Sequence, residues 1–282
     1  MGVLVLGIRV RRIRHGVQRR VTTAPMRPDD VAALGIEPLS ARSVVLSALL
    51  GTHPPTLPGR SLVALAELFG IRPGTARTSL SRMVTNGELI THDGHYSLAG
   101  RLLERQREQD GGQTAPAVEW NGDWIVAIAA SDRRSMAERR AFRESMVGSR
   151  LAELRPDIWM RPANTAGPPR PADVLITSGP LACDDVDDLV ARLWPLTELE
   201  ATAQRLHDAL TRQRSALDHG EIELMPQSFM VAAAAVRFLR IEPQLPSTLA
   251  PPTWTATALR SAYDDFNHDF QGQLRDFFAA TR

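Results

Sequence analysis

The segment Gly74–Gly87 most constrains what this chain can fold into, because its residues separate onto two chemically different helix faces. One face is apolar and contains Ala76, Leu80, Met83 and Val84. The other carries short hydroxyl side chains and arginines, namely Thr75, Arg77, Thr78, Ser79 and Arg82. No acidic residue occurs between Leu68 and Gly87. Hydroxyl groups and arginines are the donors with which a helix contacts phosphates and base edges, so the segment predicts a DNA recognition helix.

The sequence on both sides of this helix predicts a winged helix-turn-helix domain over residues 40–109. Residues Ser61–Phe69 have helical apolar spacing, and Gly70–Gly74 forms a short turn. Asn86-Gly87 predicts the end of the recognition helix. Asp93-Gly94 lies between β-prone residues and predicts a hairpin, the wing. The alternative is a small helical subdomain with no role in nucleic-acid binding.

The distribution of arginine favours a nucleic-acid partner. The 282-residue chain has a formal net charge of only +1, and all 33 of its basic residues are arginine. Residues 1–105 hold fourteen arginines and seven acidic residues, whereas residues 106–282 hold nineteen arginines and twenty-five acidic residues. A basic first third joined to an acidic remainder is typical of a DNA-binding domain attached to a sensing or assembly domain.

Two segments interrupt the globular pattern. Residues 1–39 form a basic extension and lead-in, with six arginines by Arg20 and no acid before it. They either contact DNA phosphates as a basic arm or form an unstructured extension ahead of a start at Met26. Residues 110–117 are rich in glycine and polar residues and predict a linker.

Two further domains are expected after the linker. Residues 118–194 are predicted to order as strand, helix, strand, strand and helix, which favours a ferredoxin-like α+β domain without an evident fourth strand. Its first helix is expected over Met136–Leu154. Residues 195–282 predict a helical domain. From Leu196 to Leu217 its first helix has mainly leucines, with Ala203 and Gln213, at alternating steps of three and four, a seam that packs within the monomer or across a dimer. The expected fold class is α+β and mainly α.

The single cysteine and the apolar runs bear on the compartment. Cys183 is the only cysteine, so no disulfide can form within the chain. No apolar run approaches the roughly 20 residues that span a membrane. We therefore expect a cytoplasmic protein without a membrane segment.

Short motifs follow one another along most of the chain in an ordered series. They are Arg77-x-x-Leu80-Ser81-Arg82-Met83, Gly87-Glu88-Leu89, Trp120-x-Gly122-x-Trp124, Trp159-Met160-x-Pro162 and Arg237-Phe238 followed by Pro243-x-Leu245-Pro246. With these motifs the chain from Leu39 to Phe278 resembles the PaaX family of bacterial repressors. That family controls the catabolism of aromatic acids, typically phenylacetate.

The resemblance implies a winged helix, a ferredoxin-like middle domain and a helical C-terminal domain. It also implies a homodimer that represses a catabolic operon from a palindromic double-stranded DNA operator. An acyl-CoA thioester, typically phenylacetyl-CoA, is then the effector that releases it. A CoA thioester needs cations for its phosphates and an apolar slot for its acyl group. The candidate effector-binding residues are Arg237, Arg240 and Trp254.

Two motifs depart from the family pattern in the part expected to sense the effector. Trp254-Thr255-Ala256 stands where Trp-Pro-Gly is expected, and Glu242-Pro243 stands where Asp-Pro is expected. These changes leave the identity of the effector open.

The residues expected to bind DNA extend beyond the recognition helix. Arg42 and Arg60 are candidates for phosphate contacts, and the wing carries two histidines towards the DNA backbone or the minor groove. The full expected set is Arg42, Arg60, Arg72, Thr75, Arg77, Thr78, Ser79, Arg82, His92 and His95.

A metal-dependent nucleic-acid-processing enzyme is the alternative function. Small ferredoxin-like nucleases place an aspartate at the end of the first strand, where this chain has Asp132. A metal nuclease gathers several carboxylates, whereas two arginines follow Asp132, which suits a helix N-cap better. The acidic run Asp184–Asp188 equally suits the start of a helix.

The chain lacks the common motifs of nucleotide-binding loops, serine hydrolases and zinc proteases. No catalytic residue, metal or cofactor is therefore expected. A third hypothesis is a ligand-sensing scaffold whose winged helix contacts protein instead of DNA.

Overall fold

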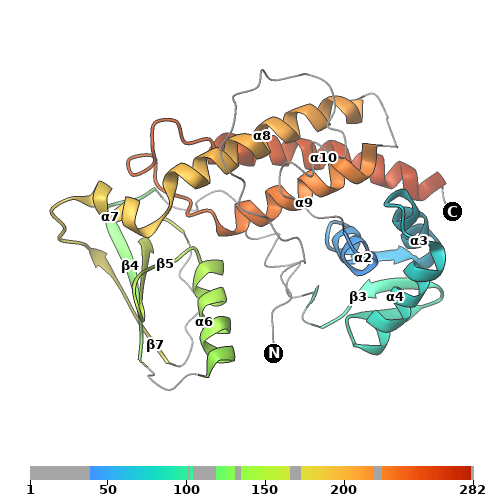
Figure 1. Cartoon of the computed structure of the whole chain (residues 1–282), viewed down its shortest axis with the longest axis horizontal. Helices are drawn as coiled ribbons and strands as arrows, with labels where there is room; N and C mark the ends of the chain where they lie inside the picture. The colour runs from blue at the N-terminus through green and yellow to red at the C-terminus, as the bar shows by residue number, and fades with distance from the viewer. Residues whose placement is uncertain are drawn as a thin grey trace. The chain divides into compact units, whose positions relative to one another are not determined.

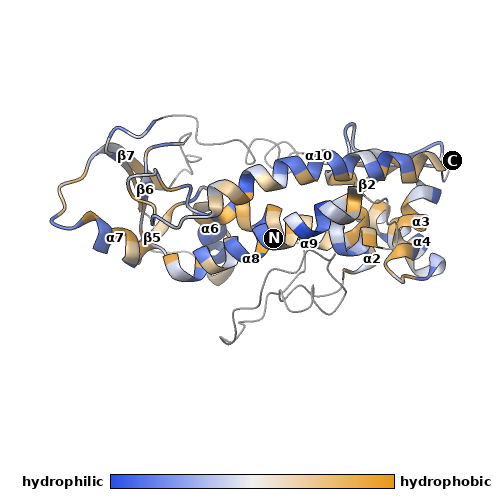
Figure 2. Cartoon of the chain, turned by 90° about the horizontal axis from the view of Figure 1, so that it is seen from above, coloured by the Kyte–Doolittle hydropathy of each residue, from blue (hydrophilic) through white to orange (hydrophobic). Residues whose placement is uncertain are grey.

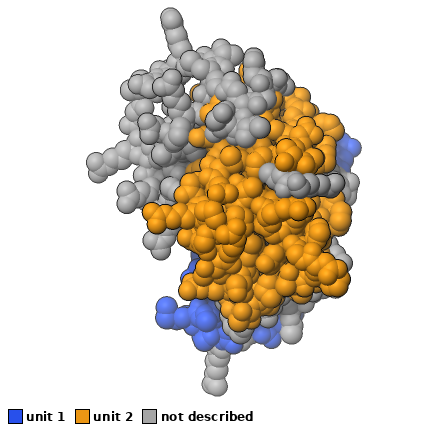
Figure 3. Space-filling model, turned by 90° about the vertical axis from the view of Figure 1, so that its right-hand side faces the viewer, with its two compact units in different colours: residues 1–3, 112–204, 237–257 blue, residues 4–111, 205–236, 258–282 orange. Residues whose placement is uncertain are grey.

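The structure is a computed structural model that describes residues 39–100, 102–103, 119–130, 135–165, 173–218 and 224–280. The chain is a mixed α+β protein with two small antiparallel sheets (Figure 1). It divides into two compact units, coloured separately in Figure 3. Unit 1 comprises residues 1–3, 112–204 and 237–257, and unit 2 comprises residues 4–111, 205–236 and 258–282. Three long helices contribute residues to both units: α8 (Leu196–Asp218), α9 (Met225–Ile241) and α10 (Ala256–Ala280).

Unit 2 begins with three helices and a small sheet. Its elements are α2 (Ala41–Leu50), β1 (Thr56–Pro58), α3 (Gly59–Leu68), α4 (Pro73–Thr85), β2 (Leu89–His92) and β3 (His95–Leu98). The sheet has the strand order β1-β3-β2 and is antiparallel throughout. The backbone N–H of Ser43 donates to the hydroxyl of Ser40, 3.2 Å away, which caps the start of α2. The buried apolar residues Val44, Leu62 and Leu80 come from the three helices and form a common core.

A chain of aromatic rings ties this part of unit 2 to its C-terminal helices. The ring of Phe69, at the end of α3, lies 5.3 Å from that of Phe229 in α9. Phe229 lies 6.0 Å from Phe270 in α10, which stacks on Phe266 at 5.6 Å. Hydrophilic and hydrophobic residues alternate along α10 (Figure 2), as expected of a helix with one buried face. Arg214 of α8 donates to Asp265 and Asp269 of α10 at 2.9 and 2.8 Å.

Unit 1 is built on a four-stranded antiparallel sheet with the order β5-β6-β4-β7. Its elements are β4 (Asp123–Ala129), α6 (Met136–Gly148), β5 (Ala152–Arg155), β6 (Ile158–Pro162), β7 (Val174–Pro180) and α7 (Val186–Leu193). A capping box closes the start of α6, because the N–H of Glu138 donates to Ser135 and the N–H of Ser135 donates to Glu138. Asp185 caps α7 by accepting from the N–H of Asp188 at 2.9 Å.

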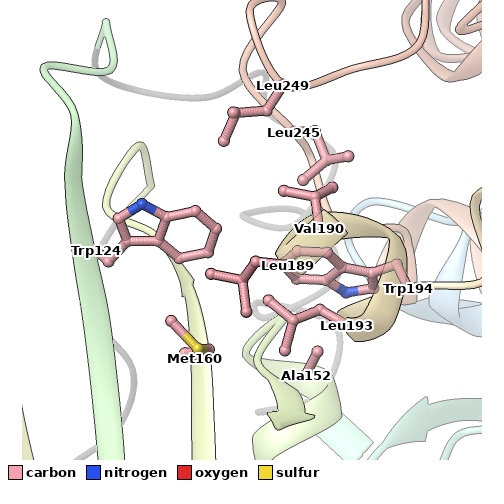
Figure 4. Close-up of a cluster of buried hydrophobic side chains, with 9 residues drawn as sticks. All are labelled: Trp124, Ala152, Met160, Leu189, Val190, Leu193, Trp194, Leu245 and Leu249. Atoms are coloured by element: carbon pink, nitrogen blue, oxygen red, sulfur yellow. The ribbon is translucent and has the colours of Figure 1, made fainter. Parts of the chain in front are cut away.

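Each face of this sheet has its own apolar cluster. Residues Ile125, Ala127 and Trp159 pack with Met146 of α6 on one face. On the other face, Trp124 and Met160 point towards α7, Leu245 and Leu249 (Figure 4). The alternation of residues along β4 between the two clusters follows from the twofold periodicity of a strand.

The predicted helix Met136–Leu154 was too long, and the expectation of no evident fourth strand was wrong. The helix ends at Gly148, Arg150 adopts a left-handed φ of 61°, and β5 follows at Ala152. A left-handed residue is a common way to end a helix, and it redirects the chain into the sheet. The predicted three-part domain division stays a prediction. The predicted linker, residues 1–38 of the predicted extension, and Asp132 lie outside the described residues.

Candidate nucleic-acid interface

The helix α4 begins at a tight turn after α3. Gly70 has a φ of +70°, a left-handed conformation that favours glycine, and the N–H of Ile71 donates to the carbonyl oxygen of Ala66 at 3.0 Å. Arg72 is the N-cap residue and Pro73 occupies the first turn of α4. Proline is favoured there because its missing N–H has no partner in a first helical turn and its φ is already helical.

The two faces of α4 differ as the sequence predicted. Ala76, Leu80 and Met83 are buried against the rest of the domain. The exposed face contains Thr75, Arg77, Thr78, Ser81, Arg82 and Thr85. This set of exposed residues carries two cations and no acidic residue. Among the described residues, neither Arg77 nor Arg82 forms an ion pair, so both guanidinium groups are available to an anionic partner.

The hydroxyl groups of this face are already oriented by the helix. Thr78 donates to the carbonyl oxygen of Gly74 at 2.8 Å, and Thr85 donates to that of Ser81 at 3.1 Å. Each hydroxyl oxygen can still accept a hydrogen bond, but its proton is engaged within the helix. Ser79 differs from the other expected contacts because it is half-buried and lies 3.9 Å from the sulfur of Met83. It therefore sits at the border of the exposed face.

The two arginines expected to contact phosphates have different surroundings. Arg60 is exposed in the first turn of α3. Arg42 of α2 instead makes a two-pronged ion pair with Glu88, in which its Nε lies 3.0 Å from Oε2 and a terminal nitrogen also contacts Oε1. The two side chains are 28% and 22% exposed. This pair joins α2 to the residue before β2, and it occupies much of the guanidinium group that the sequence assigned to DNA.

The strands β2 and β3 form the hairpin that the sequence predicted. Asp93 and Gly94 both have left-handed φ values, 48° and 74°, which allow a two-residue turn between His92 and His95. His92 is 93% exposed, and its Nε2 lies 3.1 Å from Asp93 Oδ2. His95 is also exposed, with Nδ1 3.1 Å from the carbonyl oxygen of Asp93. Both histidines thus lie at the tip of the hairpin.

Gly59, the first residue of α3, contacts the turn of the hairpin. Its N–H donates to the carbonyl oxygen of Gly94 at 2.9 Å. A Cβ atom at residue 59 would lie only 2.8 Å from Cε2 of Tyr96, in β3. The close approach of Tyr96 therefore requires glycine at this position. Sequence reasoning missed this contact and the pair of Arg42 with Glu88, because both join residues far apart in the sequence. The one available signal was an acidic residue, Glu88, directly after a basic segment.

The three expected effector-binding residues lie in unit 1. Arg237 and Arg240 belong to the end of α9, and Trp254 lies two residues before α10; all three are half-buried. Burial lowers the pKa of Arg237 below its ordinary value. A partly desolvated cation interacts more strongly with an anion than one in bulk water does.

Unit 1 also contains a deeply buried arginine that the sequence did not single out. Arg161 of β6 is 2% exposed and donates to the carbonyl oxygens of Pro162 at 3.0 Å and Thr165 at 3.4 Å. Burial, together with the charge of Arg150, lowers the pKa of Arg161 to about 10. Nearby, Asn164 donates to the carbonyl oxygen of Gln244 at 2.7 Å, which ties the sheet to the segment after α9.

Two features of the described residues bear on other classes of function. Within the described ranges, no group of three or more His, Cys, Asp or Glu side chains is arranged to hold a metal ion. No helix among the same residues is both long and apolar enough to cross a membrane.

The comparisons with known proteins match the two ends of the described chain. Residues 40–102 match the family model of the PaaX-like proteins, and residues 194–280 match that of the PaaX-like protein C-terminal domain. The matches define a PaaX-like protein with both characteristic domains, and together they cover more than half of the chain. The chain therefore belongs to the PaaX family, a family of transcriptional regulators.

A solved structure agrees with this assignment. The uncharacterized protein Rv0674 from Mycobacterium tuberculosis is 35% identical in sequence and has a TM-score of 0.67. The similarity covers 84% of this chain and 98% of that protein. No curated protein matches the chain.

Proposed function

We propose that the chain is a cytoplasmic, homodimeric repressor that binds a palindromic operator of an aromatic-acid catabolic operon through a winged helix-turn-helix domain. The exposed face of α4 is the observation that carries this proposal. It presents Arg77, Arg82 and several hydroxyl groups without an acidic side chain. A positively charged face without acidic side chains is attracted to the phosphates that line a DNA groove.

The order of elements supports the winged helix interpretation. The helices α3 and α4 follow one another through a short turn, and the hairpin of β2 and β3 comes next along the chain. In this arrangement α4 enters the major groove, Arg77 and Arg82 donate to guanine or phosphate, and the histidines of the wing approach the backbone. Arg60 and Arg72 add phosphate contacts from the starts of α3 and α4.

The sheet of unit 1 supports a ferredoxin-like middle domain. Its strand order, β5-β6-β4-β7, and its antiparallel pairing are those of the ferredoxin-like sheet. The helix α7 follows the last strand, β7, instead of preceding it, so the chain departs from that fold in the position of its second helix.

We propose further that an acyl-CoA thioester such as phenylacetyl-CoA releases the repressor. Arg237 and Arg240 would bind its phosphates, and Trp254 would contact its acyl group. The partial burial of all three residues supports this assignment, because a ligand held there is shielded from water. Two motifs of this chain depart from the family pattern, at Glu242-Pro243 and at Trp254-Thr255-Ala256. The acyl group is therefore the part of the effector in which we expect a difference from phenylacetyl-CoA.

A DNA titration tests the proposal. The full chain is titrated against the DNA upstream of its own gene at two salt concentrations, with and without phenylacetyl-CoA. The proposal predicts tight binding that weakens steeply with salt and is lost when the thioester is added. If the chain binds DNA tightly and phenylacetyl-CoA does not release it, the repressor function stands and this effector is refuted. Absence of DNA binding at both salt concentrations would contradict the repressor and favour the scaffold.

Two substitutions separate the effector site from the DNA-binding site. Arg237→Ala and Arg240→Ala should leave DNA affinity unchanged while raising the concentration of thioester needed for release. Arg140→Ala is the matched control, because Arg140 is 79% exposed on α6 and pairs only with Glu144 among the ion pairs described. If all three variants respond to the thioester as the unaltered protein does, Arg237 and Arg240 do not bind the effector.

A further inference from the structure

Arg150 lies in the turn between α6 and β5 in a conformation that an arginine rarely adopts. Its φ of 61° is left-handed, which brings Cβ close to a carbonyl oxygen and costs free energy in residues other than glycine. Strain of this kind persists only where the surroundings hold the residue in place, and it is concentrated at functional sites. A glycine would make the same turn without strain, so an arginine here indicates a role for its side chain.

The side chain of Arg150 reaches the last turn of α9. Its Nη2 donates to the carbonyl oxygen of Leu239 at 3.2 Å, and Arg150 is half-buried. Leu239 lies between Arg237 and Arg240, which are three residues apart and therefore share one face of α9. The turn after α6 thus brings a third arginine to the two that the sequence assigned to the effector.

A fourth arginine lies near Arg150. Burial and then the charge of Arg150 lower the pKa of Arg161 to about 10, so the two guanidinium groups are close enough to repel each other. The side chain of Asn164 donates to the carbonyl oxygen of Gln244 at 2.7 Å, which joins the end of β6 to the segment after α9. All of these residues belong to unit 1. Three elements of one unit therefore bring together an arginine cluster, which consists of Arg150, Arg161, Arg237 and Arg240.

Positive charge predominates in the segments that form the arginine cluster. Residues 149–151, 158–165 and 237–244 contain four arginines and one acidic residue, Glu242. Glu242 is 2% exposed, and its Oε2 accepts from the N–H of Gln244 at 2.8 Å. The carbonyl oxygens at the end of a helix add the equivalent of about half a negative charge. Because the burial of like charges is costly and an anion offsets that cost, this setting favours an anionic ligand.

We propose that Arg150 is a phosphate-binding residue of the effector site and contacts the CoA part of the thioester together with Arg237 and Arg240. A guanidinium group presents a planar fork of N–H donors that matches two oxygens of a phosphate. Arg161 is too deeply buried to touch the ligand, and its charge adds to the positive potential. The inference rests on the proposed function, because it assigns a further residue to the same effector. Free coenzyme A carries the same phosphates, so it should bind here without an acyl group.

Isothermal titration calorimetry of the full chain with coenzyme A and with phenylacetyl-CoA tests this assignment. Arg150→Gln keeps an N–H donor for the carbonyl oxygen of Leu239 and removes the charge. It should raise the Kd of both ligands by the same factor, about 10- to 100-fold, because both ligands carry the same phosphates. A side chain with a purely structural role would not produce this equal loss with an unchanged circular dichroism spectrum.

Two further variants complete the titration. Arg150→Lys keeps the charge without the planar fork, so it should show a smaller loss that is again equal for the two ligands. This variant decides the question by itself if Arg150→Gln does not fold. Arg155→Gln is the matched control, because Arg155 is exposed on β5 of the same unit and its replacement should leave both affinities unchanged.

Four outcomes would overturn the assignment of Arg150. If Arg150→Gln binds both ligands as tightly as Arg155→Gln does, Arg150 does not bind phosphate, and the proposed effector stands. A loss for phenylacetyl-CoA alone, or no binding of free coenzyme A to the unaltered chain, would refute the role in phosphate binding. An equal loss of affinity for operator DNA would assign Arg150 to DNA phosphates instead. An unaltered chain that binds neither ligand would overturn both this inference and the proposed effector.

Discussion

Replacing Gly59 with alanine should destabilise the domain, although alanine is the better helix former. The new Cβ atom would lie 2.8 Å from Cε2 of Tyr96 and 3.4 Å from the carbonyl oxygen of Gly94. Carbon atoms prefer a separation of about 3.5–4.0 Å. The Tyr96 ring or the start of α3 must therefore move, and the hydrogen bond from Gly59 to Gly94 is strained by that movement.

The magnitude follows from two opposing effects. Overpacking of this kind costs about 1–3 kcal/mol. The lower conformational entropy of unfolded alanine offsets about 0.4–1 kcal/mol of that cost. The free energy of unfolding should fall by about 1–2 kcal/mol, which lowers the Tm by roughly 2–8 °C if the cooperative unit has about 150–250 residues.

The helix α4 offers a matched control for this experiment. Gly74 also lies in the first turn of a helix, and a Cβ atom there would meet no atom within 4 Å. Gly74→Ala should therefore raise the free energy of unfolding by about 0.4–1 kcal/mol. Thermal and urea unfolding of both variants measure the difference. A Gly59→Ala variant as stable as Gly74→Ala would refute the argument.

A double-mutant cycle identifies the cause of the loss. In a Tyr96→Ala background the close approach is absent, so adding Gly59→Ala should no longer destabilise the protein. If Gly59→Ala costs the same free energy in both backgrounds, the contact with Tyr96 is not the reason that residue 59 is glycine.

Three further predictions concern an ion pair, a buried arginine and a threonine of α4. Arg42→Ala and Glu88→Ala should each lower the free energy of unfolding by about 1 kcal/mol in urea unfolding. Since either substitution removes the same ion pair, the double variant should lose less than the sum of the two losses. Additive losses would contradict this pairing. Arg161→Ala should lower the free energy of unfolding by about 2–4 kcal/mol in the same assay, because the side chain is 2% exposed and donates to two carbonyl oxygens; an unchanged stability would contradict its structural role. Thr78→Ser removes the methyl group of Thr78, whereas Thr78→Val keeps it and removes the hydroxyl, whose proton is already donated to Gly74. If the methyl group contacts thymine, Thr78→Ser should bind the operator about 0.8 kcal/mol more weakly than Thr78→Val in fluorescence anisotropy. The reverse order would refute this role of the methyl group.

The faces of α4 were predictable from the sequence because they depend on local spacing. A period of 3.6 residues placed Ala76, Leu80 and Met83 on one side, and the structure buries these three residues. The turn Asp93-Gly94 was predictable for a similar reason, since two consecutive left-handed residues favour this pair. Local patterns of this kind carry most of the information on helices and tight turns.

The features that the sequence did not reveal depend on distant residues. The pair of Arg42 with Glu88 spans 46 positions, and no local pattern distinguishes Arg42 from an arginine that is open to DNA. The strand β5 is only four residues long and begins soon after α6 ends, so its first residues, with the charged Glu153 among them, were taken for the last turn of the helix. The burial of Arg161 likewise depends on the sheet, in which β6 lies between β5 and β4.

The affinity of Arg77→Ala and Arg82→Ala for operator DNA tests the central claim most directly. Both side chains are exposed on α4, so their removal should leave the fold and its circular dichroism spectrum intact. Each variant should lose about 1–3 kcal/mol of binding free energy, roughly 5- to 150-fold in Kd. Arg140→Ala, on α6 of unit 1, should bind as the unaltered chain does. If Arg77→Ala and Arg82→Ala both bind DNA as tightly as Arg140→Ala, α4 is not the recognition helix.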